Sequence, residues 1–182
     1  MRYAITGSIG TGKTTIANIF KERGYNVYDA DKMVHDLYKD ENILKDVEKI
    51  FPDAFCDGVM DKKKIANIIF NDKNKKKELE DLIHPLVRKK IEEIDNAIIE
   101  VPLLFESKME DIFDKTILVY CSKDEQIKRI MKRNNISKDD AIKRINSQMD
   151  IEEKKKYADF VIINEGPNDV INKQVDDIIS KL

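Results

Sequence analysis

The chain has 182 residues, 41% of them hydrophobic, and its 33 basic and 35 acidic residues give a formal net charge of −2. This length and composition suit one domain with insertions and provide enough apolar residues for a packed core, which excludes a chain disordered by composition. The near balance of charge argues against a general nucleic-acid or membrane binder, so we expect neither class of partner.

Residues 7–14 match the phosphate-loop motif G-x-x-x-x-G-K-[ST] in full. The apolar residues 3–6 predict a short buried strand before the motif, and apolar positions at helical spacing predict a helix after it, ending at Gly24. In such an arrangement backbone N–H groups surround the phosphates, Lys13 reaches the β- and γ-phosphates, and the Thr14 hydroxyl ligates Mg²⁺. A glycine-rich turn that matches by accident is the alternative, but the flanking strand and helix argue against it. The sequence therefore predicts nucleoside triphosphate binding.

Four further segments are short, rich in β-branched residues and separated by helical patterns, which is typical of buried parallel strands. They are residues 26–29, 97–101, 116–120 and 160–163. Together with residues 3–6 they predict an α/β fold with a five-stranded parallel sheet and helices on both faces. Ligands of such sheets bind beyond the carboxyl ends of the strands, so the residues after each strand carry most of the functional information.

Two stretches are too long for simple crossovers between strands. Residues 32–95 show mostly helical patterns and predict a helical insertion that caps the strand ends. Residues 122–156 predict a helical lid, in which a first helix breaks at Asn134-Asn135 and a new helix starts at Ser137. The nucleotide-binding core would then consist of residues 1–31, 96–121 and 157–182.

The two cysteines, Cys56 and Cys121, lack the spacing of metal ligands. Cys121 follows a strand-like segment, which favours a buried reduced thiol, although a disulfide stays open. No charged and apolar leader precedes the first expected strand, and no apolar run approaches the length that spans a membrane. We therefore expect a cytoplasmic protein.

Asp31 and Glu100 are the acidic residues with the clearest candidate roles. The segment Asp29-Ala30-Asp31 ends the second expected strand, and we expect it next in space to the phosphate loop. Asp31 can take a proton from an acceptor hydroxyl, hold the water shell of Mg²⁺, or cap the helix that follows. With the phosphate loop in the same chain, we favour a functional role. Glu100, in the third expected strand, holds the place where an NTPase often carries the carboxylate for Mg²⁺-bound water.

Other candidate residues follow the third strand or lie in the insertion and the lid. The chain must turn at Pro102, because proline cannot continue a central strand, and Glu106 just beyond fits either a substrate site or a solvated surface. Arg129 and Arg133 lie one helical turn apart on one face. They can cover a triphosphate as water is expelled, although most arginine pairs at this spacing are surface ion-pair partners. His84 ends a predicted helical turn before a proline and fits a structural hydrogen bond better than catalysis.

The chain resembles the dephospho-coenzyme A kinases, a family of P-loop kinases. The matching segments occur in the family's order and span nearly the whole chain. They are residues 6–15 (TGSIGTGKTT), 29–31 (DAD), 82–87 (LIHPLV), 101–106 (VPLLFE), 144–148 (RINSQ) and 158–166 (ADFVIINEG). The phosphate loop is shared by many NTPases, whereas the other segments in this order are much more specific. Two positions depart from the family pattern: Ser8 replaces a usual glycine and is tolerated if its backbone angles are ordinary, and Thr14 replaces the commoner serine but keeps the hydroxyl.

The resemblance implies that ATP phosphorylates the ribose 3′-hydroxyl of dephospho-coenzyme A, the final step of coenzyme A synthesis, with Mg²⁺ as a second cofactor. It also implies that residues 32–95 bind coenzyme A, and we expect the chain to act as a monomer. The implied catalytic residues are Asp31 as base, Lys13 and Arg133. The implied ATP contacts are Gly10, Thr11, Gly12, Lys13, Thr14, Thr15, Arg129, Asn164 and Gly166. The implied acceptor contacts are Asp31, His84, Pro102, Leu103 and Glu106, and the implied Mg²⁺ residues are Thr14 and Glu100.

Two other functions stay open at this point. A nucleoside monophosphate kinase would share Lys13 and a lid but would need extra arginines for the phosphate of its acceptor. A nucleotide-dependent switch or assembly module would hydrolyse nucleotide slowly and signal through its shape. The absence of an Asn-Lys-x-Asp guanine-reading motif argues against the switch.

Overall fold

The computed structural model describes residues 1–182, which divide into two compact units. The larger unit comprises residues 1–30 and 94–182, and the smaller unit comprises residues 31–93. The limits of the smaller unit fall within two residues of those of the predicted helical insertion, residues 32–95. Its proposed role in binding coenzyme A stays a prediction.

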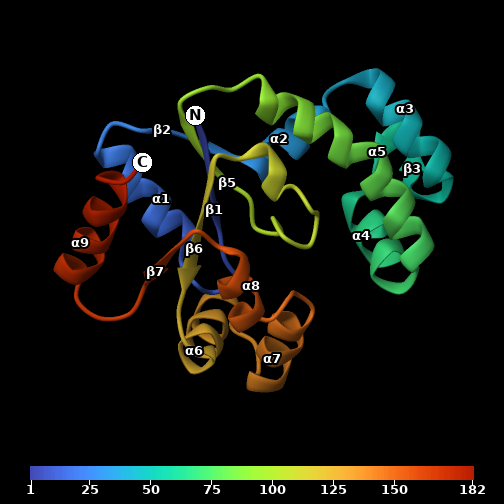
Figure 1. The fold of residues 1–182 in the computed structure, drawn as a ribbon. Coiled ribbons are helices and arrows are strands. Elements are labelled where there is room, and N and C mark those ends of the chain that lie inside the picture. Colours follow the sequence, from blue (N-terminus) through green and yellow to red (C-terminus); the bar gives the residue numbers. More distant parts are fainter. The chain divides into compact units, whose positions relative to one another are not determined.

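The larger unit is built on a five-stranded parallel sheet with the strand order β2-β5-β1-β6-β7 (Figure 1). The strands are β1 (Arg2–Thr6), β2 (Asn26–Asp29), β5 (Ala97–Glu100), β6 (Lys115–Tyr120) and β7 (Phe160–Ile163). All five expected strands are present, with their ends displaced by at most one residue. Three consecutive residues of β5 are fully buried, as a strand covered on both faces requires.

The order of the strands was not predicted from the sequence. β5 lies between β1 and β2, so β2 does not pair directly with β1, the strand that leads into the phosphate loop. Burial gives the reason, because Ile98 and Ile99 of β5 are fully buried whereas Asn26 and Tyr28 of β2 are exposed, as suits an edge strand. The residue that faces the end of β1 is Glu100, which pairs in register with Ile5. The expected nearness of Asp29-Ala30-Asp31 to the phosphate loop stays a prediction.

Helices cover both faces of this sheet. On one face, α1 (Lys13–Glu22) and α9 (Asn168–Ile179) pack against alternate strand residues in one apolar cluster that includes Ile5, Ile117 and Val119. On the other face, α8 (Ile151–Tyr157) contacts β6, where the Tyr120 hydroxyl donates a hydrogen bond of 2.8 Å to Glu152. Strand side chains alternate in direction, so Tyr120 points away from the face that carries Ile117 and Val119. A short 3₁₀ helix, η2 (Glu110–Ile112), precedes β6.

The predicted lid segment contains α6 (Lys123–Asn134), α7 (Lys138–Asn146) and nearly all of α8. The expected break is present, because α6 ends at Asn134 and the next residue, Asn135, has a left-handed conformation with φ of 50°. The Ser137 side chain then accepts a hydrogen bond from the N–H of Asp140 and caps α7. α6 and α7 share a small core around Ile127, Ile130 and Ala141. Movement of this segment as a lid stays a prediction.

The smaller unit is mostly helical, as its sequence predicts. Its elements are α2 (Ala30–Leu37), α3 (Glu41–Ile50), η1 (Pro52–Ala54), β3 (Phe55–Cys56), β4 (Val59–Met60), α4 (Lys62–Asn71) and α5 (Lys73–Glu92). A core around Val47, Phe51, Ala54 and Ile65 holds them together. The antiparallel hairpin of β3 and β4 was not predicted. Its signal was the dipeptide Asp57-Gly58, whose φ angles of 50° and 77° are those that a two-residue hairpin turn requires.

The helix α5 corrects the expectation that a helical turn ends at His84. α5 continues through Pro85 to Glu92, so His84 lies inside it. A proline inside a helix removes one backbone hydrogen bond and costs about 3 kcal/mol. The helix persists because Ile83, Val87 and Ile91 remain buried along its length, which offsets this cost.

The two cysteines form no disulfide, and Cys121 is buried whereas Cys56 is exposed, which confirms the reduced, buried thiol expected for Cys121. Burial raises the pKa of Cys121 to about 11. A segment able to cross a bilayer is not found among the helices, since none combines sufficient length with sufficient apolarity.

Candidate active site

The phosphate loop runs from the carboxyl end of β1 to the first residue of α1. Gly10 and Gly12 have φ angles of 83° and 86°, in the left-handed region that side chains disfavour. A Cβ atom at Gly10 would also lie 3.0 Å from the backbone oxygen of Gln126. Ser8, where the family usually has glycine, is not among the residues with positive φ, so this departure is tolerated as expected.

The start of α1 offers N–H groups to an anion. Gly12 precedes the helix and provides no side-chain cap for its first turn. The first N–H groups of a helix have no partner within the helix and carry partial positive charge, which favours a phosphate. The Lys13 ammonium lies over the same loop and donates to the backbone oxygens of Gly7 at 3.0 Å and Ser8 at 3.2 Å. This arrangement can hold a polyphosphate.

The two residues predicted to hold Mg²⁺ meet at the carboxyl edge of the sheet. The Thr14 hydroxyl donates a hydrogen bond of 3.0 Å to Oε2 of Glu100. The register that pairs Glu100 with Ile5 accounts for this contact, because it places the end of β5 beside the strand that leads into the phosphate loop. A hydroxyl and a carboxylate fit Mg²⁺, which proteins usually hold through one or two oxygen ligands together with substrate phosphates.

Arg129 and Asn164 both bind the backbone of the phosphate loop. Nη1 of Arg129 donates to the Thr11 oxygen at 3.3 Å, and its Nη2 donates to the Asn164 oxygen at 2.8 Å. Nδ2 of Asn164 donates to the same Thr11 oxygen at 2.7 Å. These bonds join α6, the loop after β7 and the phosphate loop. They place the two predicted nucleotide residues at the loop, bonded to its backbone.

Two cavities adjoin this cluster. One of about 460 Å³ is lined by Gly10, Gly12, Arg129, Lys132 and Arg133. Both lid arginines therefore line the same cavity as two glycines of the phosphate loop. The Nε atom of Arg133 also donates a hydrogen bond of 3.1 Å to the side chain of the neighbouring Asn134.

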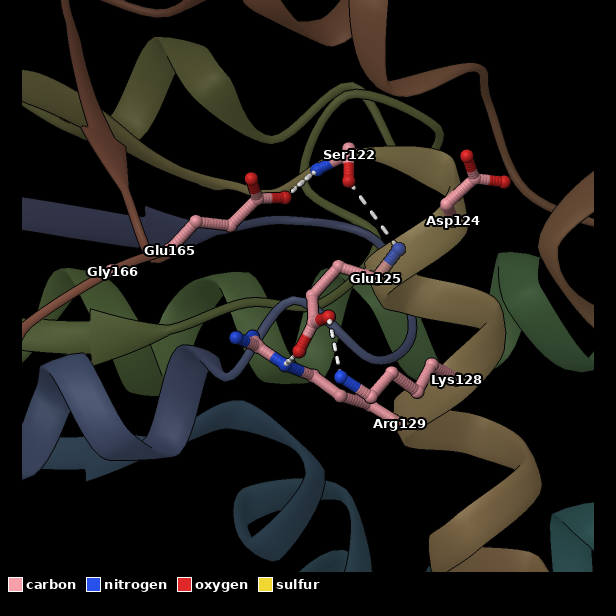
Figure 2. A pocket seen from close by; sticks show the side chains of 7 residues that line it. All are labelled: Ser122, Asp124, Glu125, Lys128, Arg129, Glu165 and Gly166. Carbon is pink, nitrogen blue, oxygen red and sulfur yellow. Dashed lines mark hydrogen bonds and ion pairs between the residues drawn. The ribbon is translucent and has the colours of Figure 1, made fainter.

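The second cavity, of about 300 Å³, is shown in Figure 2. Its lining residues are Ser122, Asp124, Glu125, Lys128, Arg129, Glu165 and Gly166. The Glu125 carboxylate pairs with both Arg129 and Lys128, at 2.8 Å and 3.6 Å. Glu165 accepts a hydrogen bond from the backbone of Ser122, which lowers the pKa of this carboxyl. Gly166 thus lines the same cavity as Arg129, beside a carboxylate, Glu165, that was not predicted as a site residue.

The turn after β5 carries Pro102, Leu103 and Glu106. Leu103 is exposed, whereas Oε1 of Glu106 lies 2.9 Å from the ammonium of Lys154 on α8. This contact excludes the alternative that Glu106 is a solvated surface charge. Sequence reasoning missed Lys154, because it begins a run of three lysines that resembles a solvated helix face, yet only Lys154 of the three is buried.

Asp31 and His84 belong to the smaller unit, and their positions relative to the phosphate loop stay predictions. Asp31 lies in the first turn of α2, which begins one residue earlier at Ala30. It is therefore not the residue that precedes and caps this helix, although an acidic side chain in a first turn is favoured by the helix dipole. His84 lies in the interior of α5.

Comparisons with known proteins agree with this arrangement. The family described as dephospho-CoA kinase matches residues 1–169 of the chain. The dephospho-CoA kinase of Sulfurimonas denitrificans is 37% identical, and the match covers 98% of this chain and 92% of that protein. The dephospho-CoA kinase of Aquifex aeolicus is 39% identical, and the match covers 100% of this chain and 97% of that protein.

Solved structures agree as well. The dephospho-CoA kinase of Campylobacter jejuni has a TM-score of 0.71 at 35% identity, with 99% of this chain and 96% of that chain covered. A shikimate kinase from Bacteroides thetaiotaomicron has a TM-score of 0.62 at 15% identity, with 100% and 99% covered. At this low identity the second likeness shows the fold alone, which is that of P-loop kinases.

Proposed function

Because the chain belongs to the dephospho-CoA kinase family, we propose that it transfers the γ-phosphoryl group of ATP to the ribose 3′-hydroxyl of dephospho-coenzyme A. The products are coenzyme A and ADP, and the reaction is the last step of coenzyme A synthesis. The observation that carries this proposal is the phosphate loop at the carboxyl edge of the sheet, with Lys13 above it and the Thr14–Glu100 pair beside it.

The phosphate loop binds ATP. We assign Gly10, Thr11, Gly12, Thr14 and Thr15 to ATP binding, because the partial positive charge at the start of α1 favours the phosphates. Lys13 exchanges its bonds to the loop carbonyls for oxygens of the β- and γ-phosphates. Phosphoryl transfer involves little covalent chemistry on the protein, so positioning and charge stabilisation supply most of the rate.

Thr14 and Glu100 would hold Mg²⁺, with the hydroxyl as a direct ligand and the carboxylate receiving hydrogen bonds from metal-bound water. When bound, this ion neutralises charge on the phosphate oxygens. The existing hydrogen bond between the two side chains supports the assignment, because it keeps both oxygens at one point of the sheet edge.

The lid arginines and the loop after β7 serve the nucleotide. Arg133 stabilises the charge that spreads over the phosphoryl oxygens during transfer, while Arg129 covers the nucleotide from α6. Their shared cavity with Gly10 and Gly12 supports these roles. Asn164 and Gly166 line the adenine side.

Asp31 orients the acceptor hydroxyl and takes its proton as the general base. Pro102, Leu103 and Glu106 contact the acceptor, with His84 close by. Residues 32–95 bind the coenzyme A portion, and residues 122–156 close over the nucleotide. Since one chain supplies every one of these residues, we expect a monomer, and a substrate of this kind suits a cytoplasmic enzyme.

An acceptor competition assay tests this function. The purified protein receives ATP and Mg²⁺ with dephospho-coenzyme A, AMP, CMP or shikimate, and ADP release is followed together with product mass. We expect phosphorylation of dephospho-coenzyme A with a kcat/KM well above that of the other three acceptors. A preference for AMP or CMP would assign a nucleoside monophosphate kinase, and ATP hydrolysis that requires an added macromolecule would assign a switch.

A further inference from the structure

Lys154 is completely buried, although it lies on a short helix between charged neighbours. Its ammonium contacts Oε1 of Glu106 at 2.9 Å and the backbone oxygen of Pro102 at 3.4 Å. Removing an ammonium and a carboxylate from water costs several kcal/mol per ion, and only good geometry with further hydrogen bonds repays this cost. The position therefore calls for an explanation.

The carboxylate of Glu106 is only half satisfied. Its Oε1 accepts the ion pair from Lys154 and also a hydrogen bond of 3.0 Å from the N–H of Met149. Its Oε2 is buried and makes no hydrogen bond. A buried ion pair can often be replaced by apolar side chains of similar volume without loss of stability. Stability alone therefore does not account for this pair.

The residues just before Lys154 also contact the phosphate loop. Oε1 of Gln148 accepts a hydrogen bond of 2.8 Å from the N–H of Ile9. Met149, the next residue, donates to Glu106, and Lys154 follows within α8. Residues 148–154, which we name the connector, thus touch both the loop that binds phosphates and the turn after β5. The matching segment 144–148 had no assigned role in the sequence, and its last residue makes the contact to the loop.

We infer that Lys154 is a positioning residue for phosphoryl transfer, which fixes the acceptor-side turn, residues 102–106, against the connector and thereby against the phosphate loop. The inference rests on the proposed function. Lys154 touches neither reactant, and it acts by holding the Glu106 carboxylate and the Pro102 carbonyl. Because small misplacements of a bound reactant reduce rates severely, loss of this contact affects use of the acceptor more than binding of ATP.

The test uses three variants of the whole chain. Lys154→Met removes the charge at similar length and leaves Glu106 buried. Lys154→Met with Glu106→Leu replaces the ion pair with apolar side chains. Lys156→Met is the matched control, because Lys156 lies on the same helix and pairs with Glu153 at 2.5 Å but is exposed. Thermal unfolding is measured for each variant, and kcat and KM are measured separately for ATP and for dephospho-coenzyme A.

We expect Lys154→Met to lower kcat/KM for dephospho-coenzyme A at least about tenfold, as a misplaced reactant does, while KM for ATP changes less than about twofold. Lys156→Met should match the wild type. The double variant should unfold near the wild-type temperature, which would show that the ion pair is not needed for stability, and it should lack wild-type acceptor kinetics because both Lys154 and Glu106 are gone. The acceptor defect of a folded Lys154→Met separates positioning from stabilisation, because a purely structural ion pair would change the unfolding temperature and leave the kinetics of the folded enzyme unchanged.

Wild-type acceptor kinetics in the double variant, or in a folded Lys154→Met, would overturn the inference. If Lys154→Met does not fold, Gln148→Met decides, because it cuts the connector from Ile9 without touching Glu106: we expect a lower kcat/KM for dephospho-coenzyme A, and unchanged acceptor kinetics would overturn the inference. A wild-type protein that does not phosphorylate dephospho-coenzyme A would instead refute the proposed function. The two failures are therefore distinguishable in one series of assays.

Discussion

Polar groups at the amino ends of the five strands have hydrogen-bond partners, whereas several buried polar atoms near the carboxyl ends have none. We call these two sides of the sheet its amino edge and its carboxyl edge. At the amino edge, hydrogen bonds join the strand starts: Asp114 accepts the N–H of Arg2 at 2.6 Å, and Asp159 accepts both the N–H and the hydroxyl of Thr116, at 2.8 Å and 2.9 Å. At the carboxyl edge, buried polar atoms remain without partners. They are Thr6 Oγ1, Ser8 Oγ, Glu106 Oε2 and Gln126 Oε1.

A buried polar atom without a hydrogen bond costs about 1–3 kcal/mol, so a fold shaped by stability alone would fill such positions. At the amino edge, the polar groups named above have such partners. The carboxyl edge keeps unpartnered groups and glycines with positive φ where ligands of parallel sheets bind. The comparison predicts that substitutions after the carboxyl ends change rates more than stability, and that substitutions at the amino edge do the reverse.

The largest effect is expected at Asp31, which follows the carboxyl end of β2 by two residues. Asp31→Asn removes the base and should lower kcat about 10²- to 10⁴-fold while ATP binding stays largely intact. Steady-state kinetics and calorimetric ATP titration measure the two quantities. Asp36→Asn is the control, because Asp36 lies on the same helix and pairs with Lys39 at 2.6 Å. Turnover near the wild type would assign Asp31 to stabilising the first turn of α2.

Lys13→Ala is expected to lower kcat about 10²- to 10³-fold, the loss that follows removal of one preorganised charge-stabilising group. The thermal unfolding temperature should change little, because the side chain is half-exposed and lies over its own loop. Lys21→Ala, at an exposed position on the last turn of the same helix, is the control. A large fall in unfolding temperature without a selective fall in kcat would contradict the prediction that substitutions at the carboxyl edge change rates more than stability.

The sequence predicted the regions whose structure depends on neighbours in the chain. The phosphate loop is one, because glycines, lysine and threonine at fixed spacing act within a few residues of each other. The break at Asn134-Asn135 and the cap at Ser137 are others, since caps and turns are local. The five strands were also predicted, because continuous apolar segments indicate strands buried on both faces.

The features that were missed or wrongly predicted depend on distant contacts. The position of β5 between β1 and β2 follows from how strands pair, which no single segment encodes. Lys154 resembles its two exposed neighbours, and only its partner 48 residues away in the sequence, Glu106, distinguishes it. Similarly, α5 passes through Pro85 because tertiary burial outweighs the local preference. The Asp57-Gly58 turn is different, since its signal was local and was overlooked.

Glu100→Gln tests the metal assignment at the carboxyl edge. Glutamine still accepts the Thr14 hydrogen bond but loses the charge, so we expect the apparent affinity for Mg²⁺ to fall about 10- to 100-fold, as for other residues that orient metal-bound groups. The rate is measured against Mg²⁺ concentration at fixed ATP, and excess Mg²⁺ should restore much of it. Asp95→Asn, an exposed residue before the other end of β5, is the control. An unchanged Mg²⁺ titration would remove Glu100 from the metal site.

The smallest effect is expected at the amino edge, at Asp159. Burial acts to raise the pKa of this carboxyl, but hydrogen bonds from Lys115 and Thr116 outweigh burial and hold the pKa below its ordinary 3.8. Since the folded pKa lies below the unfolded one, the ionised group stabilises the fold above about pH 4, and this stabilisation is lost as the pH falls through the folded value.

Asp159→Asn keeps an acceptor for Thr116 but removes the charge. We expect the free energy of unfolding at neutral pH to fall by about 1 kcal/mol, a value discounted because the side chain is 36% exposed, with kcat unchanged. Urea unfolding at neutral pH and below about pH 4 measures the difference, which should shrink at the lower pH as the wild-type carboxylate gains its proton. A difference that persists there would mean that hydrogen-bond geometry rather than charge stabilises this edge. A fall in kcat would mean that the amino edge, too, contributes to the reaction, and the contrast between the two edges would not hold.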